Sequence, residues 1–236
     1  MPAARARSGF DLEWGFAAVD DLVFGTVKKS HGIDQGQQPA TVFMKSLDEY
    51  LRDAEHAHGH LCAGQVLGVR MAMLGLQKLG IDNPQGKDGK RLVTFVEIDR
   101  CATDAVAVVT GCRLGKRALK FRDWGKVAAT FVDIASGRAI RVSAKESSKA
   151  LARQLHPEIT DKNQQQMLAY REMTDDHLFT TQWVKVNLPP EESPGYKGER
   201  VVCDACGEGI NFRREVRRQD KVLCRGCAGE NYFEPA

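Results

Sequence analysis

The residues best suited to chemistry are concentrated in one short stretch, His56-Ala-His-Gly-His-Leu-Cys62. Three imidazoles and a thiol lie within it, although the whole chain has only six His and seven Cys. Alternate residues of an extended segment point to one side, so we expect His58, His60 and Cys62 to converge on one ion or substrate. Thiolate and imidazole ligands suit a soft or borderline metal such as zinc. The same residues also suit a nucleophilic Cys62 with His58 or His60 as its base.

Helices are expected on both sides of this stretch. Ser46 is a plausible N-cap for a helix over 46–56, which Gly59 would end. A longer helix is expected over 61–79, and its positive end would favour a thiolate at Cys62. Gly64, Gly68 and Gly75 lie inside that second helix, where each Gly costs about 1 kcal/mol relative to Ala. Close approach of another backbone along this face is the expected reason.

Two further thiols of the central region lie in positions typical of binding loops. Cys101 follows an expected strand and is flanked by Asp99 and Asp104, and Cys112 lies in a Gly-bounded loop that leads to Lys116. Loops after rigid elements are where binding groups are usually placed. A single Cys is more often a small buried hydrophobe. Together with the neighbouring imidazoles, these thiols favour a real site.

The C-terminal region contains four cysteines arranged as a pair of pairs: Cys203, Cys206, Cys224 and Cys227. Two C-x-x-C pairs can close a tetrahedral zinc site, and four thiolates leave no open coordination position. The zinc is therefore expected to be structural. A strand over 210–216 and a short helix over 228–233 would complete a module that resembles a treble-clef zinc finger.

Composition narrows the class of protein. The chain has 236 residues, 42% of them hydrophobic, and a formal net charge of +3. It has no apolar run long enough to span a membrane, and acidic residues over 11–21 argue against a signal peptide. We therefore expect a cytoplasmic protein with reduced thiols. The charge is too small to imply nucleic acid, and the arginines over 213–218 lie in a tail whose charges nearly cancel.

The remaining pattern predicts an α+β fold, with helices packed on a mixed or antiparallel sheet. The expected domains are a core over 1–188 with an N-terminal extension over about 1–40, a Pro-rich linker over 189–199 and a four-cysteine zinc finger over 200–236. At this size a hydrophobic core alone is rarely enough and a metal or disulfides usually supplement it; with reduced thiols, zinc is favoured over disulfides. The elements expected after the second helix are strand 92–98, helix 104–109, strands 127–134 and 139–143 joined by a two-residue turn at Ser136-Gly137, helices 147–155 and 162–173, and strand 179–188.

Four ordered motifs within residues 45–145 give the chain a family resemblance. They are His58-Gly-His-Leu-Cys-Ala-Gly64, Glu97-Ile-Asp-Arg-Cys-Ala-Thr-Asp-Ala105, Thr110-Gly-Cys-Arg-Leu-Gly-Lys116 and Asp123-Trp-Gly-Lys-Val-Ala-Ala-Thr-Phe131. This series resembles the FmdE family, named after one of the subunits of formylmethanofuran dehydrogenase, a molybdenum or tungsten enzyme. Some members of that family also have a C-terminal treble-clef zinc finger.

The resemblance implies an α+β core, commonly dimeric, in which the His/Cys motif lines a cavity that can hold a metal. By position, the matching residues are His58, His60, Cys62, Asp99, Cys101, Asp104, Cys112 and Lys116. The resemblance implies a cofactor-binding role for the last five of these: Asp99, Cys101, Asp104, Cys112 and Lys116. Ala63, Arg113 and Arg117 depart from the family's usual Pro, Thr and Gly. The two arginines would change which anion or cofactor fits beside the loop at 110–112.

Three functional hypotheses follow. The first is a metal-binding protein, homodimeric, with a His/Cys core site for a second metal ion such as zinc and a structural zinc in the tail. It would be accessory to a molybdenum- or tungsten-type oxidoreductase such as formylmethanofuran dehydrogenase, or handle its cofactor, and Lys116 and Arg113 would receive an anionic group. The second is a stand-alone Cys/His or metal-dependent enzyme on an unknown small molecule. The third is a regulator whose zinc finger binds nucleic acid or protein.

Overall fold

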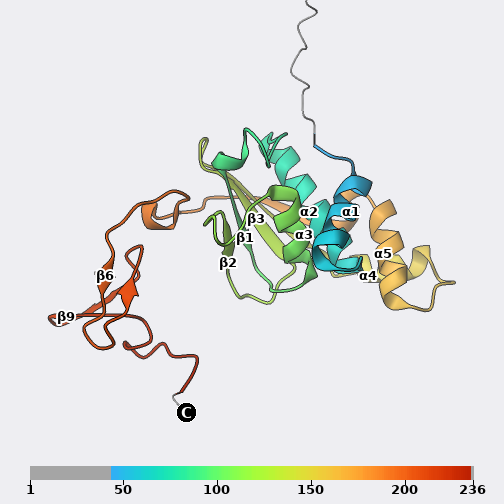
Figure 1. The fold of residues 1–236 in the computed structure, drawn as a ribbon. Coiled ribbons are helices and arrows are strands. Elements are labelled where there is room, and N and C mark those ends of the chain that lie inside the picture. Colours follow the sequence, from blue (N-terminus) through green and yellow to red (C-terminus); the bar gives the residue numbers. More distant parts are fainter. Residues whose placement is uncertain (1–43, 235–236) are drawn as a thin grey trace, which may run out of the picture. The chain divides into compact units, whose positions relative to one another are not determined.

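A five-stranded mixed sheet forms the centre of the core, and its helices pack on one face (Figure 1). The computed structural model describes residues 44–234, so the expected N-terminal extension lies outside the described residues. The strand order is β2-β1-β3-β4-β5, with β1 and β2 parallel and the other neighbours antiparallel. The predicted α+β class, with helices on a mixed sheet, is therefore confirmed.

Four of the six described α-helices begin and end within two residues of the predicted positions, and the short helix Asp175–Leu178 was not predicted. Their bounds are α1 Leu47–His58, α2 Ala63–Leu79, α3 Cys101–Thr110, α4 Ser147–Leu155, α5 Lys162–Glu172 and α6 Asp175–Leu178. Ser46 and Glu49 form a capping box at the start of α1, and Gly59 ends that helix with a φ of 93°. The prediction that α3 begins at Asp104 is wrong, because the helix starts one turn earlier, at Cys101. The hydroxyl of Thr103 donates to the carbonyl oxygen of Ile98 at that start.

The strands show three departures from the expected pattern. Their bounds are β1 Leu92–Val96, β2 Leu119–Phe121, β3 Ala128–Asp133, β4 Arg138–Ala144 and β5 Phe179–Val184. The hairpin between β3 and β4 is confirmed, but Asp133 pairs with Arg138, so its loop spans 134–137 rather than two residues. Strand β2 was not predicted. Strand β5 ends at Val184, because the chain then leaves the sheet and packs Val186 and Leu188 on a second apolar cluster.

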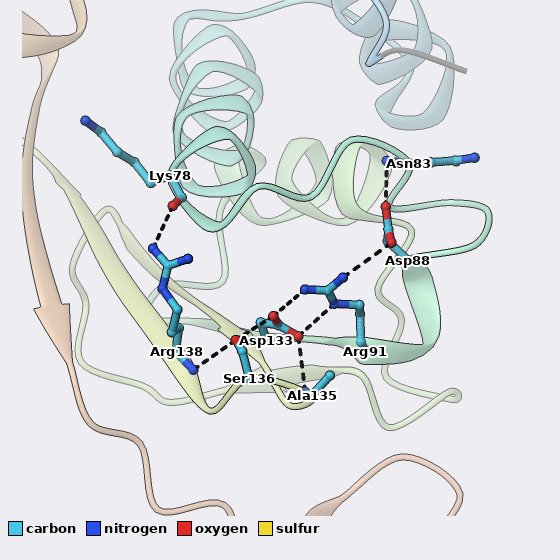
Figure 2. A network of polar contacts seen from close by, with 8 residues as sticks. All are labelled: Lys78, Asn83, Asp88, Arg91, Asp133, Ala135, Ser136 and Arg138. Atoms are coloured by element: carbon cyan, nitrogen blue, oxygen red, sulfur yellow. Dashed lines mark hydrogen bonds and ion pairs between the residues drawn. The ribbon is translucent and has the colours of Figure 1, made fainter. Parts of the chain in front are cut away.

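The end of the β3–β4 hairpin is fixed by a polar network around Asp133 (Figure 2). Asp133 is 1% exposed, and its carboxylate accepts hydrogen bonds from Arg91 Nε at 2.8 Å and from Arg91 Nη2 at 2.5 Å. The hydroxyl of Ser136 and the backbone N–H of Ala135 also donate to it, at 2.6 and 3.1 Å. These donors, above all the Arg91 guanidinium, hold the pKa of Asp133 well below its usual range.

The C-terminal region contains two short antiparallel ribbons. Strands β6 Val201–Val202 and β7 Gly209–Ile210 form one, and β8 Val216–Arg218 and β9 Lys221–Leu223 form the other. The predicted strand over 210–216 is wrong, because Phe212 and Arg213 take left-handed φ values of 61° and 53°. The predicted helix over 228–233 is also wrong, since the described chain there forms turns and bends. The treble-clef topology and the boundaries at 188 and 199 therefore stay predictions. None of the described helices is long and apolar enough to cross a membrane.

Candidate metal centre

Three helix ends meet at the candidate site. Helix α1 ends at His58, Cys62 is the N-cap of α2, and Cys101 is the first residue of α3. The three helices pack against one another and lie side by side in Figure 1. A ring nitrogen of His58 and the Sγ atoms of Cys62 and Cys101 all lie within 4.8 Å of one another. Ligand atoms of a tetrahedral zinc site are about 3.5–3.8 Å apart, as bond lengths of about 2.0–2.3 Å require. The three residues therefore suit one metal ion.

Asp104 orients one of these groups. Its Oδ2 atom lies 2.8 Å from Nδ1 of His58. An ionised carboxylate at this distance accepts a hydrogen bond from Nδ1–H, which leaves Nε2 of the ring available as a ligand. Metal-ligating histidines almost always have such a partner, and it raises the basicity of the ligand. Asp104, which the family resemblance placed among the cofactor-binding residues, thus contacts the cluster through His58.

The extended geometry expected for 58–62 is wrong. His58 is the last residue of α1, and Gly59 then turns left-handed, so the alternation of side chains does not run through this segment. The structure instead joins His58 and Cys62 to Cys101. His60 lies beside them, with its ring centroid 4.8 Å from that of His58. Ligation by His60 stays a prediction.

The two thiols of the cluster influence each other. Cys62 is buried and Cys101 is half-buried. Burial raises the pKa of the Cys101 thiol, and its hydrogen bond and Coulombic interaction with the neighbouring Cys62 raise this pKa further. A bound cation would remove this conflict, because a coordinating thiol is deprotonated outright.

Cys112 and Lys116 are not at this cluster. They follow the opposite end of α3, and a helix of ten residues is about 15 Å long. Cys112 is 2% exposed and accepts a hydrogen bond from the Thr94 hydroxyl at 3.5 Å, and burial raises the pKa of its thiol. Lys116 lines a different cavity, together with Lys90 and Arg113. The expectation that Lys116 and Arg113 serve the same site as Cys62 therefore finds no support in the geometry.

A cavity of about 710 Å³ adjoins the cluster. Asp99, predicted from sequence, lines it with His60 and the two cysteines. Sequence reasoning missed Asn163 and Gln166 of α5, which also line it. Asn163 accepts a hydrogen bond from the backbone N–H of Ala63, one of the free amides at the start of α2, at 3.0 Å. No motif surrounds Asn163, so only the packing of α5 against α2 reveals its role.

The four cysteines of the tail form the second cluster. Their Sγ atoms all lie within 4.8 Å of one another, with Cys206 and Cys224 3.9 Å apart. Backbone amides turn toward the sulfurs: the N–H of Cys224 donates to Cys203 at 3.2 Å, and that of Cys227 to Cys224 at 3.3 Å. Amide donation, first from Cys224 and then from Cys206, lowers the pKa of Cys203 to about 6. This is the geometry of a zinc knuckle pair with a closed shell.

The fold and the two clusters define a metal-binding protein with an α+β core and a four-cysteine zinc-finger tail. Residues 57–180 match the family described as FmdE, molybdenum formylmethanofuran dehydrogenase operon. The chain belongs to the FmdE family. Residues 196–233 match the prokaryotic dksA/traR C4-type zinc finger, which agrees with the zinc predicted for the tail.

Two relatives show how far the similarity extends. The chain is 30% identical over 205 residues to a protein of Archaeoglobus fulgidus named "Probable S-adenosyl-L-methionine-binding protein", covering 79% of this chain and 54% of that one. It thus spans about half the length of that relative. The fold also resembles the crystal structure of a tungsten formylmethanofuran dehydrogenase FmdE-like protein from Syntrophus aciditrophicus, with a TM-score of 0.56 and 20% identity. That match covers 84% of this chain and all of the other.

Proposed function

We propose that the core binds one metal ion through His58, Cys62 and Cys101 and opens its fourth coordination position toward the adjoining cavity. The observation that supports this is the convergence of one ring nitrogen and two thiols within 4.8 Å, with Asp104 behind the imidazole. A donor set of one nitrogen and two sulfurs suits zinc, and three protein ligands are typical of sites that bind a further ligand or substrate. A bound zinc would act there as a Lewis acid.

A thiol enzyme is the alternative use of the same residues. In such an enzyme Asp104 would orient the imidazole of His58, His58 would act as the base, and Cys62 would be the nucleophile. A nucleophile of this kind needs one thiol, however, and the cluster brings a second, Cys101, to the same point. The paired thiols favour metal ligation.

The biological role that we propose is accessory to a molybdenum- or tungsten-type oxidoreductase such as formylmethanofuran dehydrogenase, with the chain acting as a homodimer. The family's description and the name of the structural relative support this assignment. Size-exclusion chromatography with light scattering tests the dimer. Co-elution with the catalytic subunits of a formylmethanofuran dehydrogenase tests the complex, and a monomer that elutes apart from them contradicts both statements.

The cavity favours a second candidate, the binding of S-adenosyl-L-methionine. The name of the Archaeoglobus relative suggests this ligand, and a cavity of about 710 Å³ lies within the range typical of small-molecule sites. The carboxylate of an amino-acid moiety suits an open metal position. Isothermal titration of S-adenosyl-L-methionine into metal-loaded and metal-depleted protein decides this candidate, which predicts saturable binding that weakens when the core metal is removed.

Metal content tests the core site directly. We expect two zinc equivalents per chain in the intact protein, and about one in Cys62→Ser and in Cys101→Ser. Cys112→Ser is the matched control, because it removes a buried thiol outside the cluster and should retain both equivalents. One equivalent in the intact protein, with rapid alkylation of Cys62 that needs His58, would refute the metal site and favour the thiol enzyme.

A further inference from the structure

The sheet face opposite the helices is only partly covered. Strand register places Val93, Val132 and Ala139 in one row across β1, β3 and β4. Val184 at the end of β5, and Val186 and Leu188 in the segment after it, pack against this row. The next row on the same face consists of Phe95, Thr130 and Arg141.

This second row forms the floor of a pocket of about 350 Å³, bordered by the 184–187 segment. Two aromatic side chains line it. Phe95 contributes its ring from β1, and Trp124 extends from the loop before β3 with 61% of its surface exposed. The Arg122 guanidinium carbon lies 5.2 Å from the centroid of the Phe95 ring. A large exposed indole beside a ring and a stacked guanidinium is a surface on which a planar group can stack.

The charges in the pocket favour an anion. Glu97 is 2% exposed, and both of its carboxylate oxygens accept from Arg141, at 2.7 Å from Nε and 2.6 Å from Nη2. The only acid of the lining is thereby neutralised. Arg122 and Lys185 remain at the rim, and of these only Arg122 pairs with a described carboxylate, that of Glu192 at 2.8 Å. The pocket is therefore mainly apolar within, and Lys185 is the cation at its edge that no described carboxylate pairs with.

We propose that this sheet-face pocket binds a planar aromatic anion, with its ring on Trp124 and Phe95 and its negative group toward Lys185 and Arg122. The pocket volume lies at the small end of the range for ligand sites, which suits one or two fused rings. The site is distinct from the metal cavity, because the two share no lining residue.

Isothermal titration with a matched pair of probes tests the assignment. Naphthalene-2-sulfonate is the planar anion, and 2-naphthalenemethanol is the neutral ring of similar size. We expect saturable one-to-one binding of the sulfonate by the intact protein, several-fold tighter than that of the alcohol. Trp124→Ala should weaken sulfonate binding about five- to tenfold through the lost ring contact. Lys185→Gln should remove most of the preference for the anion.

Trp183→Ala is the control for loss of an exposed indole. Trp183 is 53% exposed and pairs with Ile140 of the helix-covered core, so it lies on the other face of the sheet. Its substitution should change the affinity less than twofold. The far-UV circular dichroism and zinc content of every variant should match those of the intact protein.

Three results would overturn the proposal: the absence of saturable sulfonate binding, equal binding by Trp124→Ala, or equal affinity for both probes. A dimer that dissociates on Trp124→Ala would also overturn it, because the pocket would then be a subunit interface. None of these outcomes affects the core metal site, which zinc content measures independently.

Discussion

Replacement of Gly68 by Ala should disrupt the contact that brings the two core thiols together. A Cβ at Gly68 would lie 2.8 Å from both Ala102 Cα and Ala105 Cβ of α3, whereas an ordinary contact needs at least 3.4 Å. Helices α2 and α3 would therefore have to separate by about 0.6–1 Å. Overpacking of this kind costs about 1–3 kcal/mol, and the better helix propensity of Ala returns about 1 kcal/mol. The blocking atoms include the backbone of Ala102, which cannot rotate away, so the cost lies in the upper half of this range, at about 2–3 kcal/mol. We therefore expect a net loss of about 1–2 kcal/mol in the free energy of unfolding.

The same displacement should affect the metal, because metal ligands tolerate only small errors in distance. Moving α3 shifts Cys101 away from Cys62, so Gly68→Ala should lose the core zinc at chelator concentrations that the intact protein survives. Gly75→Ala is the matched control. Its Cβ would lie 2.8 Å from Cγ of Phe131 in β3, far along α2 from the thiols.

Urea denaturation and zinc content measure both effects. Gly75→Ala should lose stability and keep the core zinc, whereas Gly68→Ala should lose both. The reasoning fails if Gly68→Ala is as stable as the intact protein, or if the two variants retain the core zinc equally well.

The remaining predictions concern charges and metal. Asp133→Asn should lower the free energy of unfolding by about 2–3 kcal/mol at pH 7, which is less than the about 3–5 kcal/mol for a fully buried pair because Arg91 is partly exposed. The folded pKa of Asp133 is lowered, so this contribution is present above its unfolded pKa of about 3.9 and is lost as pH falls below it; urea titrations should show the variant approaching the intact protein in acid. Asp104→Ala should weaken the core metal about 10- to 100-fold in competition with a chromogenic chelator, while the tail zinc is unchanged. Cys206→Ser should remove the tail zinc and expose residues 200–234 to proteolysis, and protection equal to that of the intact protein would contradict a structural role.

Elements with strong local signals could be predicted from the sequence. Ser46 and Glu49 form the capping box that starts α1. Gly59 and Gly80 end α1 and α2, because each adopts the left-handed conformation that a helix end requires and that Gly takes most easily. Strand β2 could not be predicted, because its three residues form a strand only through parallel pairing with β1. In the tail, the left-handed conformations of Phe212 and Arg213 interrupt the segment 210–216 that was expected to be a strand, and a local sequence pattern does not show such a turn.

The sequence indicated the residues of the candidate site, but not which of them lie together in the fold. His58, Cys62, Cys101 and Asp104 all lie in recognisable motifs, yet adjacency in sequence favoured a trio with His60. The structure brings Cys101 to His58 and Cys62, because α3 begins one turn earlier than its apolar pattern indicates and places that thiol at the start of the helix. A helix start depends on its cap and on tertiary contacts, and neither is visible in the periodicity of apolar residues.

The three glycines of α2 show how closely the site and the packing depend on each other. A Cβ at Gly64 would lie 3.2 Å from Cys101 Cβ and 3.8 Å from Cys62 Sγ, in the space between the two cysteine side chains. Gly68 lets the backbone of α3 approach, and Gly75 accommodates the ring of Phe131. Each of these glycines costs about 1 kcal/mol relative to Ala, and a different close contact explains each one. The contacts at Gly64 and Gly68 bring the N-terminal ends of α2 and α3 close enough for Cys62 and Cys101 to share one ion.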